Sequence, residues 1–234
     1  MGAVERVTAG EELDIFQWDV RNWSRALPLW RRNLIHPPGS LGLAIGERDG
    51  GLSLLLALAG YRTSCTDIGP PSDCARELHH SYGLVELVEY EVQDATALTH
   101  EANRFDVVIF KSVIGALGSK DRQREALAEI LRVLKPGGVL LFAENMQATR
   151  FHRWLRKRFV AWNSYWRYLS FPADLDLFKG YERLEIETCG FTANVGRTEP
   201  QRDFLARADT FLAPLVPSSW RYIAYGAAFK PAHN

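Results

Sequence analysis

The stretch Leu41-Gly42-Leu43-Ala44-Ile45-Gly46-Glu47-Arg48-Asp49-Gly50-Gly51-Leu52-Ser53 decides the fold of this chain. A short apolar run enters a glycine-rich turn and continues into an apolar segment that ends at Gly60. The pattern predicts a strand, a tight loop and the start of a helix. Free backbone N–H groups at such a helix start suit a carboxylate or phosphate, and glycine lets a ligand lie against the backbone. A purely structural turn is the alternative.

The overall composition indicates one α/β domain. The chain has 234 residues, of which 47% are hydrophobic, and this is enough for one large core. Its formal net charge is zero, so we expect no nucleic-acid partner. The three cysteines, Cys65, Cys74 and Cys189, are widely spaced and match neither a disulfide framework nor a metal site. With no secretory leader or membrane-spanning run evident, these features predict a cytoplasmic protein without a metal.

Strand-like and helix-like segments alternate along the chain after the first strand. Strands are expected at 61–68, 85–92, 104–110, 139–143, 182–191 and 221–229, and helices at 72–82, 121–133 and 199–212. This alternation predicts a doubly wound, mostly parallel sheet of seven strands with helices on both faces.

Several polar residues follow predicted strands and should meet at one edge of the sheet. Right-handed crossovers bring Gly46, Asp67, Asp94 and Lys111 to one crevice at the carboxyl ends of the strands. Asp67 lies 21 positions after Gly46, where a carboxylate can accept hydrogen bonds from ribose hydroxyls. The alternative for Asp67 is a solvated turn aspartate.

With these features in place, residues 41–144 resemble the class I S-adenosylmethionine-dependent methyltransferases. The resemblance is carried by the glycine loop, Asp67, the pair Asp94-Ala95, the run Phe105-Asp106-Val107-Val108 and the run Leu131-Arg132-Val133-Leu134-Lys135-Pro136-Gly137-Gly138. It implies a single methyltransferase domain over residues 1–234, a Rossmann-like fold with an antiparallel last strand, and S-adenosylmethionine as cofactor.

The resemblance also implies particular cofactor contacts. Gly46, Glu47 and Gly50 would hold the methionine half, Asp67 the ribose, Ile68 and Ala95 the adenine ring, and Asp94 the adenine amino group. The sequence departs from the family pattern twice, because Ala44 replaces an acid and Arg48 replaces a glycine. We therefore expect Arg48, Lys111 and the segment 18–24 near the methionine half, where Glu47, Asp49 or that segment supplies the missing contact.

The segment 11–36 forms an N-terminal helical element. Phe16, Val20, Trp23 and Leu27 recur at helical spacing, which predicts a helix over 11–32. One interpretation is an amphipathic helix packed on the domain. The other is a flap over the binding site, with Trp18 and Trp23 as its walls.

A basic, aromatic segment at 147–173 follows the fifth predicted strand. It contains five arginines, one lysine, many aromatic residues and no acid. It is either an amphipathic helix with a solvated basic face or a substrate cap, which the family often inserts at this place. In a cap, arginines would hold an anionic acceptor, or residues 150–167 would contact a membrane surface.

The chemistry expected from the resemblance is methyl transfer. O-methylation of a small molecule or glycan would use a base, and the candidates are Glu144 and His152, with Tyr165 as a weaker third. Lys111-Ser112-Val113 follows the fourth strand, which argues against methylation of amino groups on DNA bases. Two alternatives are a cofactor-binding module without catalysis and a nicotinamide-dependent oxidoreductase, although the pattern G-x-G-x-x-G is missing.

Overall fold

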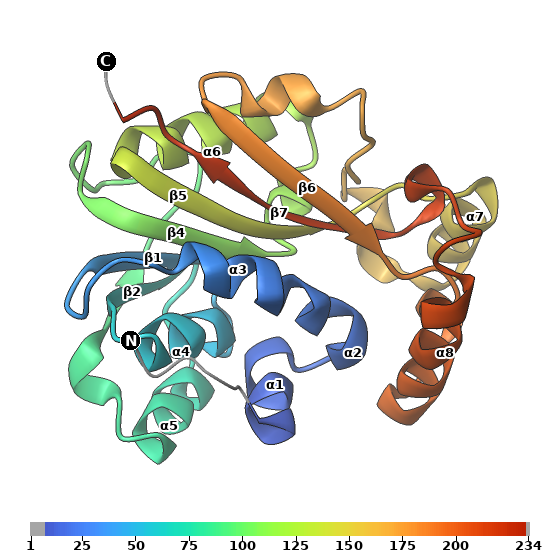
Figure 1. Cartoon of the computed structure of the whole chain (residues 1–234), viewed down its shortest axis with the longest axis horizontal. Coiled ribbons are helices and arrows are strands. Elements are labelled where there is room, and N and C mark those ends of the chain that lie inside the picture. The colour runs from blue at the N-terminus through green and yellow to red at the C-terminus, as the bar shows by residue number, and fades with distance from the viewer. Residues whose placement is uncertain (1–7, 233–234) are drawn as a thin grey trace.

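A seven-stranded sheet forms the centre of the protein (Figure 1). The computed structural model describes residues 8–232, without the side chains of residues 161 and 162. The strands are β1 (Leu41–Ile45), β2 (Arg62–Asp67), β3 (Val88–Val92), β4 (Phe105–Lys111), β5 (Leu134–Asn145), β6 (Arg183–Cys189) and β7 (Ile223–Phe229). Their order is β3-β2-β1-β4-β5-β7-β6, and β7 runs antiparallel to both of its neighbours. The predicted fold class, including the antiparallel last strand, is confirmed.

Helices cover both faces of the sheet because side chains alternate along each buried strand. On one face, Val107 and Ile109 of β4 pack with α1 (Ala9–Phe16), α3 (Leu27–Asn33) and α4 (Gly51–Leu58). On the other face, Val108 and Phe110 pack with α6 (Lys120–Val133). The remaining helices are α2 (Val20–Trp23), α5 (Asp73–Ser81), α7 (Arg150–Phe159) and α8 (Glu199–Leu212).

The single helix predicted over 11–32 is wrong, because this segment is broken into α1, α2, the 3-10 turn η1 (Ser24–Ala26) and α3. The chain breaks where Gln17 and Asp19 adopt positive φ values of 66° and 46°. Pro28 lies in the first turn of α3, where its missing N–H is not needed. It therefore helps to start a helix.

Smaller differences occur at element ends. Residues 85–87 form the 3-10 turn η2 (Val85–Leu87) before β3, and β5 begins at Leu134, before the expected strand start at residue 139. The other 3-10 turns are η3 (Ile114–Leu117), η4 (Ala161–Ser164), η5 (Leu175–Phe178), η6 (Ala193–Val195) and η7 (Ser218–Trp220). Two helices begin at hydroxyl caps, since the Ser72 hydroxyl accepts a bond from Ala75 N and the Thr198 hydroxyl accepts one from Gln201 N. Within residues 8–232, no helix is both long and apolar enough to cross a bilayer.

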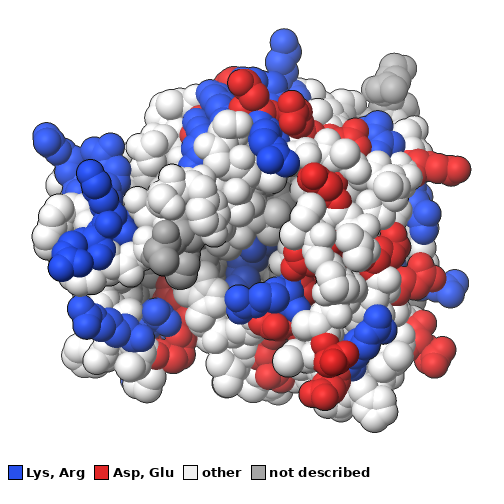
Figure 2. Space-filling model, turned by 180° about the vertical axis from the view of Figure 1, so that it is seen from behind, with Lys and Arg blue, Asp and Glu red and all other residues white. Residues whose placement is uncertain are grey.

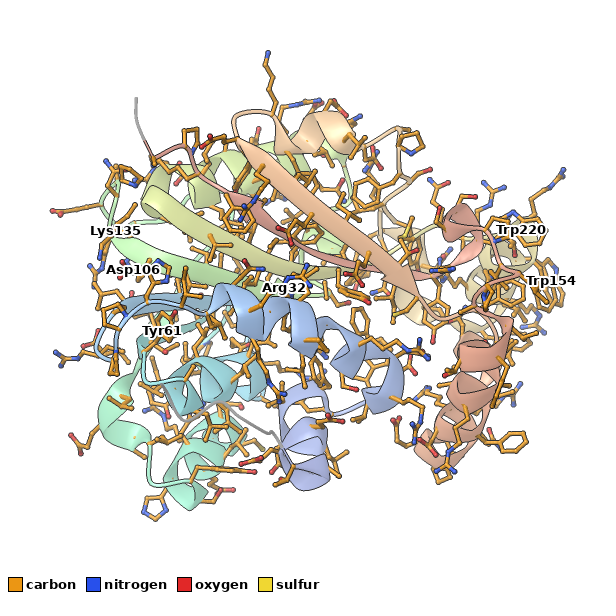
Figure 3. The ribbon with its side chains drawn as sticks, in the orientation of Figure 1. Arg32, Tyr61, Asp106, Lys135, Trp154 and Trp220 are labelled. Carbon is orange, nitrogen blue, oxygen red and sulfur yellow. The ribbon has the colours of Figure 1, made fainter. Side chains whose placement is uncertain are left out.

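The motif residues Asp106 and Lys135 brace the amino-terminal edge of the sheet. The Asp106 carboxylate accepts bonds from Leu41 N and Lys135 Nζ, each at 2.8 Å, and so joins the starts of β1, β4 and β5. Figure 3 shows both side chains at the end of the molecule opposite α7 and α8. The carboxyl ends of the parallel strands lie at the opposite edge of the sheet. The loops that carry the predicted site residues follow these strand ends.

Candidate active site

Strand register aligns the predicted residues at the carboxyl edge of the sheet. Ile45 of β1 is level with Thr66 of β2 and with Phe110 of β4. The next residues along these strands, Gly46, Asp67 and Lys111, therefore lie in one row. Asp94 follows two residues after Val92, the partner of Asp67, and Glu144 follows Ala143, the partner of Lys111. The predicted convergence at this edge is confirmed.

Asp67 and Asp94 offer carboxylate oxygens at the ends of β2 and β3. Asp67 Oδ1 accepts a bond from Ile68 N at 2.6 Å, and within residues 8–232 its other oxygen has no protein partner. The side chain of Ile68 is 69% exposed beside it. Asp94 Oδ1 accepts bonds from Thr96 N and the Thr96 hydroxyl, which hold the pKa of Asp94 below its usual value. With buried Ala95, these residues fit a ribose and an adenine ring.

The sequence predicted that free N–H groups at the start of α4 would bind a ligand. In the structure, a side chain of the loop itself accepts a hydrogen bond there. Glu47 Oε2 accepts bonds from Ser53 N at 2.8 Å and from the Ser53 hydroxyl at 3.0 Å. Burial raises the pKa of Glu47 to about 7, while the Ser53 bonds and nearby Lys111 act in the opposite direction. Gly50 is the N-cap of α4 at a φ of 81°, and Glu47 thus caps the helix that Gly50 begins.

Gly46 and Arg48 have different surroundings in this loop. Gly46 has a φ of 72°, and a Cβ there would lie 2.4 Å from Val113 Cγ2. The space beside Gly46 is therefore filled by Val113, so a side chain there would disturb packing. The Arg48 side chain is 81% exposed and pairs with Asp49 at 3.1 Å. The structure does not bring it into the row.

Lys111 is a half-buried cation at the end of β4. Its Nζ donates to Phe16 O at 2.9 Å and lies 5.2 Å and 5.4 Å from the ring centres of Trp18 and Trp23. Burial lowers the pKa of Lys111 to about 8, and Glu47 partly offsets this. Among the described residues no carboxylate lies within ion-pair distance of Nζ. An anionic ligand group would supply the missing partner.

Comparison with known proteins identifies this arrangement. Residues 43–142 match the family model described as "Methyltransferase domain". The chain is 31% identical over 136 residues to the ubiquinone/menaquinone biosynthesis C-methyltransferase UbiE of Hydrogenovibrio crunogenus, covering 52% of this chain and 50% of that protein. It is 31% identical over 122 residues to the demethylmenaquinone methyltransferase of Renibacterium salmoninarum, covering 49% and 47%. Residues 43–142 thus match a methyltransferase domain, and the chain resembles the S-adenosylmethionine-dependent methyltransferases.

Solved structures show the same fold. Phosphoethanolamine N-methyltransferase 2 of Haemonchus contortus, in complex with S-adenosyl-L-methionine, superposes with a TM-score of 0.64 at 20% identity, covering 97% of this chain and 61% of that one. A putative methyltransferase of Bacillus halodurans gives a TM-score of 0.62 at 18% identity, covering 89% and 99%. The chain spans about half the length of the curated relatives it matches.

S-adenosylmethionine is the cofactor of this family, and the row of residues suits both of its halves. The carboxylate of Asp67 and the exposed side chain of Ile68 fit the adenosine half. Half-buried Lys111, which lacks a carboxylate partner among the described residues, fits the carboxylate of the methionine half. The ring of Trp23, which is fully buried, and the ring of Trp18, which is 36% exposed, both lie beside the Lys111 ammonium. The individual contacts stay predictions.

Glu144 organises the loop after β4. One of its oxygens accepts bonds from Val113 N at 2.9 Å and Gly115 N at 3.2 Å, and the other accepts one from Asn145 N at 2.7 Å. Its side chain is fully buried, and burial raises the pKa of Glu144 to about 7. Both oxygens are engaged by backbone, so this geometry favours a positioning role over that of a base.

His152 is also engaged at both ring nitrogens. Nδ1 lies 2.7 Å from the Thr149 hydroxyl, and Nε2 lies 2.7 Å from Phe191 O. The side chain is 2% exposed, and burial lowers the pKa of His152. A neutral imidazole that donates to Phe191 O from Nε2 and accepts from Thr149 at Nδ1 satisfies this geometry. No ring nitrogen remains to take a proton from an acceptor.

A buried polar cluster at Asp19, in the N-terminal helical segment, was not predicted from the sequence. Asp19 accepts bonds from Tyr222 Oη at 2.5 Å and from Asn22 Nδ2 at 3.1 Å, and burial raises the pKa of Asp19 to about 7. The Glu199 carboxylate accepts bonds from Asp19 N and Val20 N, each at 2.8 Å. Tyr222 and Glu199 come from the far end of the chain, so no local sequence pattern predicts the cluster.

The basic segment divides into buried and exposed parts. Arg156 is 4% exposed, donates to Met146 O at 2.6 Å and lies 4.2 Å from the ring centre of Tyr168. Arg167 pairs with Asp174 at 2.7 Å. The side chain of Trp162 lies outside the described side chains, and Tyr165, the weaker candidate base, is 57% exposed.

Proposed function

We propose that this chain transfers the methyl group of S-adenosylmethionine to a small-molecule acceptor. The observation that carries the proposal is Lys111, a half-buried cation level with Asp67 that has no carboxylate partner among the described residues. Its position gives the carboxylate of the methionine half a binding group. The acid that the family usually places near the amino group of the cofactor is replaced by Ala44, so Lys111 does not substitute for that contact.

In this proposal the chain binds and orients, while the cofactor when bound supplies an electrophilic methyl group. Asp67 accepts hydrogen bonds from the ribose hydroxyls through its free oxygen. Lys111 holds the methionine carboxylate, and Phe16 O and the ring of Trp18 fix the position of its ammonium. Glu144 fixes the loop beside Gly46 through the backbone of Val113. Such positioning supplies much of the rate in a displacement reaction.

The acceptor atom is oxygen in our first candidate reaction and carbon in the second. Carbon is favoured by the names of the relatives, two of which are a C-methyltransferase of quinone biosynthesis and a demethylmenaquinone methyltransferase. An oxygen acceptor must lose its proton, yet Glu144 and His152 have their accepting atoms engaged. An acidic hydroxyl, as on a phenol, therefore suits this site better than a sugar hydroxyl.

A labelled-methyl experiment tests the proposal. We would incubate the full chain with S-adenosylmethionine carrying a 13C methyl group and with phenolic, hydroquinone and sugar acceptors. Formation of S-adenosylhomocysteine together with a labelled product is expected, and the methyl carbon shift distinguishes an oxygen product from a carbon product. Cofactor binding without turnover of any acceptor would favour the non-catalytic module. Binding of a nicotinamide cofactor in its place would favour the oxidoreductase, against which the antiparallel β7 argues.

A further inference from the structure

Helix α7 is packed the opposite way from an ordinary amphipathic helix. Its buried side chains are His152 and Arg156, which face the protein. Its aromatic side chains Phe151, Trp154 and Phe159 are 57%, 58% and 58% exposed. Since burying an apolar side chain stabilises a protein and burying a guanidinium is unfavourable, folding alone does not explain this arrangement.

The exposed aromatic side chains form one connected group. Phe151 and Trp154 are stacked with ring centres 6.0 Å apart, and Trp154 meets Phe159 edge-on at 6.5 Å. Trp220, which is 50% exposed, stacks on Phe191 at 6.4 Å, and Phe191 O is bonded to the buried His152. Figure 3 shows Trp154 and Trp220 at the same outer end of the molecule. A connected apolar group of this kind marks an interaction surface, unlike single exposed side chains.

Basic side chains accompany the aromatic group. Arg150, Arg153, Lys157 and Arg158 are exposed, and among the described residues none of them forms an ion pair. Helical spacing places Arg150, Arg153 and Lys157 in one row, next to the row of Phe151 and Trp154. Figure 2 views the molecule from behind, so its left end corresponds to the right end of Figure 1, where α7 lies. Blue side chains gather at this end of the molecule. The net charge of the chain is zero, so this positive field is local.

We propose that the outer face of α7, together with Trp220, docks on the anionic surface of a lipid membrane. Tryptophan and phenylalanine enter the boundary between headgroups and acyl chains, and arginine and lysine meet anionic headgroups. Positive charge and bulky aromatic side chains occur together here, and an anionic bilayer provides a counterpart to both. The inference does not depend on methyl transfer, although α7 follows the strand end at Asn145, so the docked face would lie near the proposed acceptor site.

Vesicle sedimentation tests the inference without measuring activity. The full chain is mixed with vesicles of phosphatidylcholine alone, or of equal parts phosphatidylcholine and phosphatidylglycerol. Binding is expected with the anionic vesicles and should weaken as salt is added. The triple variant Arg150→Gln, Arg153→Gln, Lys157→Gln should bind about a hundredfold more weakly, since each basic residue near an anionic surface contributes roughly fivefold.

A matched control removes the same charge from elsewhere. Arg62, Arg76 and Lys179 are exposed and lie outside α7, so their replacement by glutamine should leave vesicle binding almost unchanged. The double variant Phe151→Ser, Trp154→Ser keeps every charge and should also lose binding, which separates membrane insertion from simple attraction of an anion. Its circular dichroism melt should match that of the parent because both side chains are exposed.

Three outcomes would overturn the inference. One is no sedimentation with anionic vesicles at low salt, and another is equal loss of binding in the α7 and control charge variants. The third is a concentration-dependent dimer, seen by light scattering, that the Phe151→Ser, Trp154→Ser variant abolishes while the parent ignores vesicles. That result would assign the face to a second copy of the chain.

Discussion

Replacing Glu144 by alanine should destabilise the protein through the loop after β4. The amides of Val113 and Gly115 would lose their common acceptor, and an unsatisfied buried donor costs about 1–3 kcal/mol. The two amides together therefore give a loss of about 2–6 kcal/mol in the free energy of unfolding. This loss should be largest at low pH.

The pH dependence follows from the raised pKa of Glu144. Its pKa is 4.5 in the unfolded chain and about 7 when folded, so the folded state binds the proton more tightly. Parental stability from this group is therefore fully present below about pH 4.5 and falls as pH rises through 7, by up to about 3 kcal/mol. Glu144→Ala lacks this dependence, so its deficit relative to the parent should shrink between about pH 5 and 8.

Urea unfolding followed by circular dichroism measures both parts of this prediction. Glu101→Ala is the matched control, because Glu101 is exposed and has no hydrogen-bond partner among the described residues. The control should stay within about 0.5 kcal/mol of the parent. An equally small loss in Glu144→Ala at about pH 5 would refute the role of Glu144 as the anchor of this loop.

Three further substitutions address the site row. Gly46→Ala should lower the melting temperature, with a loss of about 2–4 kcal/mol, because it combines a φ of 72° with a contact 2.4 Å from Val113 Cγ2; an unchanged melt would contradict this. Glu47→Gln keeps an acceptor for Ser53 and removes a carboxyl whose pKa is raised to about 7, so urea titrations should show stability falling less between about pH 5 and 8 than in the parent. Lys111→Met should keep or raise the melting temperature, because burial disfavours the cation, yet weaken S-adenosylmethionine binding at least about tenfold by calorimetry; parental affinity would exclude Lys111 from the cofactor site.

The sheet and the placement of its strand-end residues were predictable because local patterns encode them. Apolar runs punctuated by glycine and aspartate fixed the strands, and the rule for parallel crossovers then brought Gly46, Asp67 and Lys111 to one edge. The caps at Ser72 and Thr198 follow a local rule as well, since a hydroxyl before a helical run satisfies free amides.

The N-terminal helical segment and the state of the candidate bases were harder to predict, because both depend on residues that are distant in the sequence. The helix breaks at Asp19, which is held by Tyr222 Oη and by the Glu199 carboxylate. Sequence spacing could place His152 near the edge, but not show that Thr149 and Phe191 O occupy its nitrogens. The sequence could identify Glu144 and His152 as candidates. Their roles depend on hydrogen bonds that form only in the folded chain.

Calorimetric titration of S-adenosylmethionine into the parent and into Asp67→Ala tests the central claim most directly. We predict that the parent binds the cofactor and that Asp67→Ala binds it more weakly by about 1–3 kcal/mol, the loss expected for a charged acceptor. Glu86→Ala, an exposed acid in the turn before β3, should bind like the parent. A parent that does not bind S-adenosylmethionine, or an Asp67→Ala variant with parental affinity, would contradict the cofactor site described at the carboxyl edge of the sheet.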